Sequence, residues 1–200
     1  MGDGAKKSYD EDIRRERIQM ANWMRTNRIA AALLVVVRFY LGWKWIEAGW
    51  HKIVDGFSAA GFLNKAIETP VLATGTENAM YPNFVAFLKH FALPNVELIN
   101  VLIPWGEFLV GLGLILGGLT VTAAFFGMMM NFMFLLAGTV SSNPWLILFG
   151  IVVLLAGNNA GKFGLDYYLL PLIKRAYRHI VKRKHPTDPA APVNRQGVAG

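Results

Sequence analysis

Four long apolar runs limit what this chain can fold into. They cover residues 29–53, 96–119, 120–140 and 144–170. A helix needs about 20 apolar residues to cross the hydrocarbon core of a bilayer, where its backbone groups must be satisfied internally. The sequence therefore predicts an all-α integral membrane protein, built as a four-helix bundle. A long extracytoplasmic loop, residues 55–95, would connect the first two helices.

The distribution of Lys and Arg predicts the orientation. Seven lie in residues 1–28 and seven in residues 174–200, out of 20 in the chain. Basic residues flanking apolar spans favour the cytoplasmic side. We therefore expect a multi-pass plasma-membrane protein with both termini in the cytoplasm. It would consist of a basic amphipathic tail (1–28), a membrane domain (29–172) and a second basic tail (173–200) with a disordered end.

The basic tails also bear on partners. The net charge is +7, but the basic residues flank apolar spans and form no folded basic face, so we expect membrane lipid and no nucleic acid as a partner. Residues 12–25 and 174–184 can lie on anionic lipid as amphipathic helices, and docking of a specific protein is the alternative. The chain has no cysteine, and we see no metal-ligand spacing and no flavin or haem motif.

Ionisable and polar groups inside the apolar runs need an explanation, because a charge near the bilayer centre costs about 2.5–3.5 kcal/mol. Arg38 is about 14 Å from the start of the first run, and Glu107 and Asn131 are each about 16 Å into theirs. Matching depth predicts an Arg38–Glu107 ion pair with a further hydrogen bond from Asn131. Such a pair could fix helix register or form a site for a small ligand or a proton.

The first run has two polar faces at helical spacing. One carries Arg38, Trp45, Gly49 and Lys52. The other carries Tyr40, Lys44, Glu47 and His51. We expect Glu47 to pair with Lys44 and His51 along the helix, and Lys52 to extend to water. Trp45 falls with other tryptophans near the expected outer interface, as in an aromatic belt.

The fourth run ends in the stretch GNNAGKFGLDYY. Lys162 and Asp166 are spaced for a salt bridge at a helix end. Gly157, Gly161 and Gly164 would allow another chain segment or a ligand to approach the backbone closely. The sequence leaves the choice between these two roles open.

Three motifs on the first, second and fourth runs resemble those of the DoxX family of small four-helix membrane proteins. They are R-x3-G followed by aromatic residues and A-G-x-x-K, a glutamate followed by glycines, and A-G-K-x-x-L-D, where the family more often has Arg than Lys. The matching residues are Arg38, Gly42, Ala48, Gly49 and Lys52, then Glu107, Gly111 and Gly113, then Ala160, Gly161, Lys162, Leu165 and Asp166. The resemblance covers about residues 29–172.

The long loop and the S-S-N-P turn are closer to the DoxD-like branch, described as the large subunit of a thiosulfate:quinone oxidoreductase. The resemblance implies oxidation of thiosulfate to tetrathionate, a membrane quinone as acceptor, and a small second subunit or another redox partner. The expected quinone contacts are Arg38 and Glu107 as the reacting groups, with Asn131, Trp45 and Asn158 around them. His51 and Lys52 are the expected contacts of the thiosulfate anion.

Two other functions compete with this one. The chain could be a non-enzymatic scaffold of a redox or detoxification complex, with the basic tails and the glycine-rich fourth run as docking surfaces. It could also carry a solute or protons along its buried polar groups. Whether it is an enzyme, its true substrate and its oligomeric state stay open at this level.

Overall fold

The structure is a computed structural model that describes residues 3–184, and over that range it is helical apart from loops and one isolated β-bridge. The chain divides after Tyr167 into two units, which are described separately. The disordered end predicted for the C-terminal tail, residues 185–200, lies outside the described residues. The all-α class predicted from the sequence is confirmed.

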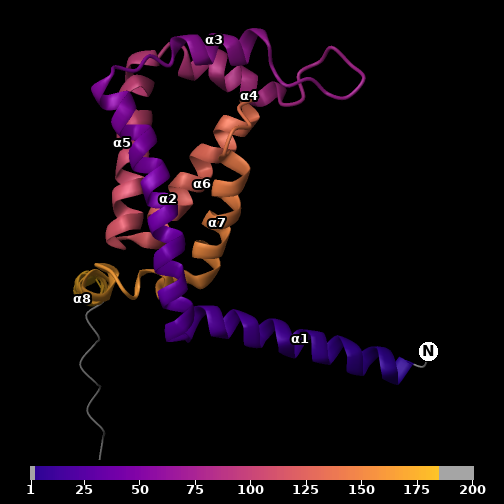
Figure 1. Ribbon diagram of the computed structural model, residues 1–200, viewed down its shortest axis with the longest axis vertical. Coiled ribbons are helices and arrows are strands. Elements are labelled where there is room, and N and C mark those ends of the chain that lie inside the picture. The colour runs from indigo at the N-terminus through magenta and orange to yellow at the C-terminus, as the bar shows by residue number, and fades with distance from the viewer. Residues whose placement is uncertain (1–2, 185–200) are drawn as a thin grey trace, which may run out of the picture. The chain divides into compact units, whose positions relative to one another are not determined.

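The elements follow one another in a simple order. They are α1 (Asp3–Thr26), α2 (Arg28–Val54), α3 (Ala60–Glu68), α4 (Pro82–Phe87), the π-helix η1 (Leu88–Ala92), α5 (Val96–Leu116), α6 (Thr120–Leu136), α7 (Asn143–Ala156), the 3₁₀ helix η2 (Gly157–Gly161) and α8 (Asp166–Lys184). In the first unit, α2 packs on α5, α5 on α6, α6 on α7 and α7 on α2 (Figure 1). We call these four helices the bundle.

Within residues 3–184, three segments are long and apolar enough to cross a membrane. They are Arg28–Val54, Val96–Leu116 and Asn143–Gly161. Helix α6 is also apolar but has 17 residues, which span about 25 Å. A core about 30 Å thick exceeds that length, so α6 by itself is too short to span it upright.

Local signals explain where the bundle helices begin and end. The Asn27 side chain accepts a hydrogen bond from the Ile29 amide at 2.7 Å and so caps the start of α2. Gly117 ends α5 with φ +63°, a conformation that glycine adopts without a side-chain penalty. Helix α6 starts only three residues later, at Thr120. The second and third apolar runs therefore form a tight helical hairpin.

The fourth run differs from its prediction. A single helix was expected over residues 144–170, but α7 ends at Ala156 and Gly157 takes φ +57°. The short 3₁₀ helix η2 and a turn follow, and α8 starts anew at Asp166. The three glycines between 157 and 164 do not extend the helix but allow the chain to leave it.

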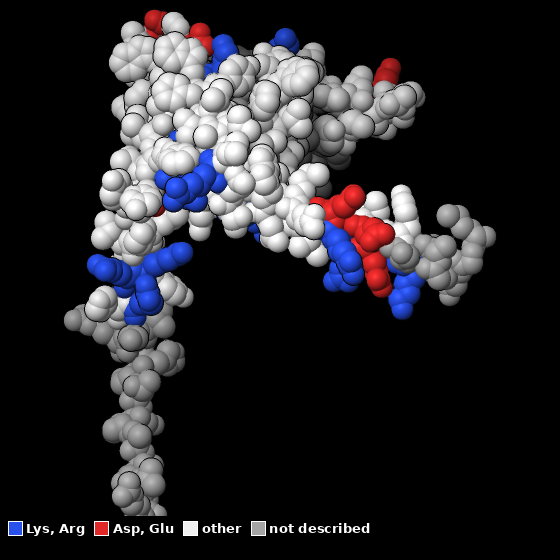
Figure 2. Space-filling view, turned by 60° about the horizontal axis from the view of Figure 1, so that its bottom comes forward, with Lys and Arg blue, Asp and Glu red and all other residues white. Residues whose placement is uncertain are grey.

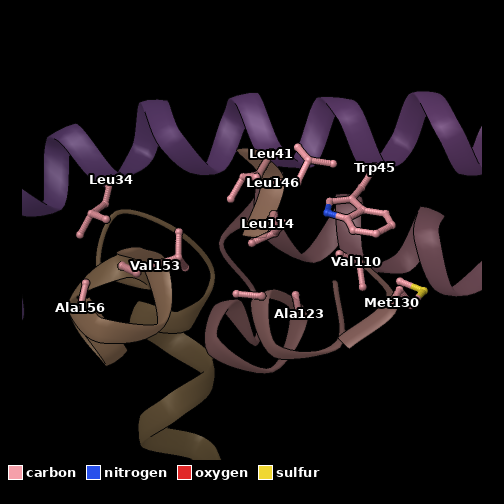
Figure 3. Close-up of a cluster of buried hydrophobic side chains, with 12 residues drawn as sticks. Leu34, Leu41, Trp45, Val110, Leu114, Ala123, Met130, Leu146, Val153 and Ala156 are labelled. Atoms are coloured by element: carbon pink, nitrogen blue, oxygen red, sulfur yellow. The ribbon is translucent and has the colours of Figure 1, made fainter. Parts of the chain in front are cut away.

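The core of the bundle lies between α2 and the other three helices (Figure 3). Its buried side chains include Leu34, Leu41, Trp45, Val110, Leu114, Met130, Leu146 and Val153. Helices α2 and α5 approach most closely at glycines: a Cβ on Gly42 would lie 2.8 Å from the Gly111 carbonyl oxygen, and one on Gly49 would lie 2.6 Å from the Phe108 amide nitrogen. These contacts fix the axial register of α2 against α5.

Residues 55–95 fold over one end of the bundle and are called the cap here (Figure 1). This segment, expected as a long loop, contains the helix α3 as well as α4 and η1. Leu63, Ala66, Leu88 and Ala92 form a second buried cluster, which includes residues at the start of α5. The Asn100 side chain accepts a hydrogen bond from the Ala59 amide at 2.7 Å, so α5 also holds the cap by a polar contact.

Helix α1 leaves the opposite end of the bundle (Figure 1). Red and blue side chains alternate along it, whereas the visible face of the bundle is mostly white (Figure 2). Arg25 donates a hydrogen bond to the Leu155 carbonyl at 3.1 Å, which ties the end of α1 to the end of α7. The helical form of the N-terminal tail agrees with its predicted character, and its contact with lipid stays a prediction.

Candidate functional site

In the part of the chain that the structure describes, the buried charged side chains and the lysine that binds one of them form two groups toward opposite ends of the bundle. Lys52 and Glu107, called the cap-side pair, lie near the cap. Arg38 and Asp166, called the turn-side cluster, lie near the turn that connects α5 and α6. The two groups have different partners and different exposure, so each is described separately.

In the cap-side pair, the Lys52 Nζ donates to the Glu107 Oε2 at 2.6 Å. The Glu107 side chain is 2% exposed and the Lys52 side chain is 28% exposed. The Lys52 ammonium also lies 5.7 Å from the centroid of the Phe57 ring, at the start of the cap. A buried carboxylate is thus held by a cation that reaches it from the half-covered rim of the bundle.

The predicted Arg38–Glu107 pair is wrong. Arg38 is 1% exposed, but its Nη2 donates to the Phe163 carbonyl at 3.3 Å, and the nearby charge that acts on it is Asp166. Its guanidinium lies against Gly117, ten residues beyond Glu107 on α5, which is about 15 Å along the helix. Arg38 and Glu107 lie at similar distances from the starts of their apolar runs, but they lie at different heights in the bundle.

The glycine contacts between α2 and α5 explain the shift. They place Gly49 beside Phe108, so Lys52, one turn further along α2, meets Glu107. Helix α5 begins in the cap, past the end of α2, and this offset carries Arg38 to the far end of α5. Lys52 was expected to extend to water, and it is partly exposed, but its ammonium is bound by Glu107. The sequence did contain a signal, because Arg38, Gly49 and Lys52 share one face of α2, and that face points inward.

Asp166 holds the α5–α6 turn together. Its Oδ1 accepts from the Leu119 amide at 2.6 Å and its Oδ2 from the Thr120 amide at 2.9 Å, so its carboxylate caps the start of α6. Its own amide donates to the Gly117 carbonyl at 2.7 Å. The predicted Lys162–Asp166 salt bridge is not formed, because both carboxylate oxygens are engaged by backbone amides.

The segment around Asp166 extends this clamp. The Leu165 amide donates to the Leu116 carbonyl at 3.0 Å, which satisfies a carbonyl at the end of α5. Gly161 lies against the Asp166 carboxylate, where a Cβ would collide with it. Gly164 approaches Gly117 equally closely, since an added Cβ would lie 2.8 Å from the Gly117 Cα. The A-G-K-x-x-L-D motif is thus a structural clasp, in which the glycines make room for backbone contact.

Asn159 is a residue that the sequence analysis missed. It is 4% exposed, and its Nδ2 donates to the carbonyls of Met24 at 2.8 Å and Asn27 at 2.9 Å, at the junction of α1 and α2. The predicted contact residue was its neighbour Asn158, which is exposed. The 3₁₀ winding of η2 decides which of the two points inward, and the α-helix expected here gave no indication of it.

Asn131 lies at the level of the cap-side pair. Asn131 is 1% exposed, and its Oδ1 has no hydrogen-bond partner among the described residues. Neighbouring contacts set its height: a Cβ on Gly106 would lie 3.5 Å from the Met130 Sδ. Because Gly106 and Met130 immediately precede Glu107 and Asn131, the latter two residues occupy the same layer of the bundle.

Trp45 is placed differently from its prediction as a belt residue. It is 4% exposed and belongs to the core, with its Nε1 3.2 Å from where a Cβ on Gly127 would lie. Gly127 is one helical turn before Asn131 on the same face of α6. Trp45 therefore lies about one helical turn from the layer that contains Asn131.

The polar face of α2 is largely as expected. The Lys44 Nζ donates to Glu47 at 3.0 Å, as predicted, and both side chains are exposed. His51 lies 3.3 Å from the carboxylate of Asp55 and not beside Glu47, so that part of the prediction is wrong. His51 is 70% exposed, whereas Lys52 is engaged by Glu107.

A family model matches more than half of this chain. Neither the curated proteins nor the solved structures contain a match to this chain. The family model described as DoxX matches residues 33–141, which is more than half of the chain and includes both ends of the α2–α5 contact. With its apolar helices and its matched region, the chain belongs to the DoxX family of membrane proteins.

Proposed function

We propose that this protein is the membrane subunit of a quinone-linked oxidoreductase that oxidises thiosulfate. The observation that carries the proposal is the cap-side pair: a buried carboxylate 2.6 Å from the ammonium of a partly exposed lysine, in the same layer of the bundle as the buried Asn131. Reduction of a quinone needs a hydrogen-bond donor at its oxygens and a group that delivers protons. Lys52 is such a donor, and Glu107 can hold and release a proton.

The proposal includes a topology. The four bundle helices cross the plasma membrane, with the cap outside and both termini in the cytoplasm. The Lys and Arg bias supports this orientation, since 14 of the 20 basic residues lie near the two termini. Helix α6 is short, and the second buried cluster, against which Ala137 packs, adds apolar volume beyond the end of α6. The cap-side pair then lies in the outer half of the membrane.

The buried groups offer both the hydrogen-bond donors and the acceptor that a quinone headgroup and its quinol form need. The Asn131 Oδ1 is an acceptor without a partner among the described residues, and it suits the hydroxyl of a quinol. The Lys52 ammonium has three donors, of which Glu107 takes one. A bound quinone would accept two electrons and two protons. Glu107 would hold a proton at its Oε2, and Lys52, partly exposed, would connect it to water.

The electron donor would be an anion in the outer water. Two thiosulfate ions join through a new S–S bond to form tetrathionate and release two electrons, which reduce the quinone together with two protons. Exposed basic residues of the cap, Lys89 and His90 in the π-helix η1, can attract such an anion. His51 is exposed at the same end of α2. A second subunit or another redox partner would supply the thiosulfate-oxidising chemistry.

The test uses native membranes that carry the wild-type chain or a variant, with decylubiquinone and thiosulfate. We expect quinol formation with the wild-type protein and a loss of about 10²–10⁴-fold with Glu107→Gln. The matched control is Glu47→Gln, an exposed carboxylate on α2, which should leave the rate unchanged. An azidoquinone should label α5 or α6, and the label should decrease with Asn131→Leu. Unchanged quinol formation in Glu107→Gln membranes would refute the role of the pair.

A scaffold is the second candidate function, and the exposure of α1 favours it. Most described side chains of this helix of 24 residues are exposed, so it could receive a partner along its length. Crosslinking in native membranes should then capture one stable partner, and capture should fail when residues 3–26 are deleted. An oxidoreductase whose rate survives that deletion, with no partner captured, would speak against the scaffold.

A further inference from the structure

We infer that α8 is an interfacial helix that binds the surface of an anionic membrane. This helix, Asp166–Lys184, has two distinct faces. Leu169, Ile173, Tyr177 and Ile180 follow one another at intervals of four, four and three residues. At 100° per residue they fall within an arc of about 80°, which is a continuous apolar stripe.

The opposite side of α8 is basic. Lys174, Arg175 and Arg178 lie within an arc of about 100° that faces away from the apolar stripe. Among residues 167–180 there is no Asp or Glu. A helix with a cationic face and an apolar face lies in the membrane interface, where the stripe enters the headgroup region and the cations meet lipid phosphates.

The stripe is open in the structure. Ile173 is 47% exposed, Tyr177 67% and Ile180 58%. A chain of the DoxX family lies in a membrane, and α8 starts within a few residues of the last apolar segment, so a lipid surface is within reach of its first turn. The charge of the basic face makes anionic lipid the matching occupant.

Helix α1 is a useful contrast. It is amphipathic as well, but five Asp and Glu are interspersed with six Lys and Arg along Asp3–Thr26. That near-balance gives little attraction to anionic phosphates. We therefore assign the anionic-lipid contact to α8 rather than to both tails.

The absence of cysteine makes the test direct, because one introduced cysteine is a unique labelling site. Full-length Ile180→Cys and His179→Cys proteins carry a nitroxide and are placed in vesicles of phosphatidylcholine, with or without phosphatidylglycerol. The two positions are neighbours but point about 100° apart. With phosphatidylglycerol, the Ile180 label should collide with oxygen more than with a water-soluble nickel complex, and the His179 label should show the reverse.

The charge dependence provides the second arm. Each basic residue near an anionic surface contributes about fivefold to the binding constant. The triple variant Lys174→Gln, Arg175→Gln and Arg178→Gln should therefore lower the equilibrium constant for binding of α8 to the phosphatidylglycerol surface on the order of a hundredfold. The conservative Lys174→Arg should retain this binding. Spin–spin broadening from a second copy at the Ile180 label would overturn the inference. Two further outcomes, in protein whose helicity equals that of the wild type, would also overturn it. One is an Ile180 label that is accessible to nickel, and the other is binding of α8 that changes neither with phosphatidylglycerol nor with the triple substitution.

Discussion

The cap-side pair allows a stability measurement that separates it from every other charge in the bundle. The perturbation is a double-mutant cycle with Lys52→Met, Glu107→Leu and the double variant. Glu107 is 2% exposed in its side chain and its carboxylate oxygen is 2.6 Å from the Lys52 Nζ. Removing Lys52 leaves a buried charge without its partner, which costs about 3–5 kcal/mol. Removing both partners leaves no charge, so the double variant should lose much less than the two single variants added together.

The expected coupling energy follows from these numbers. Because Lys52 is 28% exposed, water screens part of the interaction, and we expect about 2–3 kcal/mol of coupling rather than the full cost of an isolated charge. The matched control is the Lys44–Glu47 pair on the exposed face of α2, at 3.0 Å with side chains 43% and 45% exposed. Its coupling should be about 0.3–0.5 kcal/mol.

The assay is reversible unfolding in mixed micelles, followed by far-ultraviolet circular dichroism. The coupling energy is calculated from four free energies of unfolding: those of the wild type, the two single variants and the double variant. A second cycle with Arg38→Leu and Glu107→Leu tests the separation of the two buried groups. These sites share no contact, so their effects should add to within about 0.5 kcal/mol. Coupling of Glu107 to Arg38 that equals its coupling to Lys52 would refute the described arrangement.

Three further substitutions test other parts of the fold by the same unfolding assay. Gly49→Ala should destabilise by about 1–3 kcal/mol, because its Cβ would meet the α5 backbone, whereas Gly61→Ala in the open part of α3 should stabilise by about 0.5–1 kcal/mol. Asp166→Ala should cost about 3–5 kcal/mol, since it uncaps α6 and leaves Arg38 without its counter-charge, and a loss under 1 kcal/mol would contradict the clasp. Asn159→Ala should cost about 1–3 kcal/mol by removing two hydrogen bonds, and Asn158→Ala should be neutral.

Much of the fold was predictable from apolar periodicity. The apolar runs located α2, α5, α6 and the start of α7. The helical wheel placed Arg38, Trp45 and Gly49 on one face of α2, and the structure shows that this face lies inward. Register between helices could not be obtained in this way. It depends on which glycine meets which backbone atom, and the Gly42–Gly111 contact is a relation between two helices that neither helix specifies alone.

The predicted ion pair of the candidate site was wrong for the same reason, because it depended on the register between helices. Ion pairing inside a bundle depends on height differences of a few ångströms, whereas counting residues from the end of an apolar run carries errors of a turn or more at each end. Asp166 shows a second limit. Its spacing to Lys162 suggested a local pair, but its carboxylate instead meets amides of residues 119 and 120, which only folding brings near. Because nearly every residue has a backbone amide, the sequence does not indicate which amides a carboxylate will bind.

The contrast between the two buried carboxylates indicates where chemistry should be sought. Asp166 uses both oxygens on backbone amides of a tight turn, and these donors cannot leave without opening α6. Glu107 is bound by a lysine with a flexible stem, which is partly exposed and can swing toward water while the helices stay packed. A group that exchanges protons needs such a movable partner.

If proton transfer occurs in this bundle, substituting Lys52 by Arg should retain the fold but slow turnover, because a guanidinium stays protonated and binds the carboxylate in a more rigid geometry. The same exchange at Arg38, to Lys, should affect stability and leave the rate per folded molecule unchanged. A rate that follows Arg38 and not Lys52 would place the chemistry at the turn, and the cap-side pair would then be a lock.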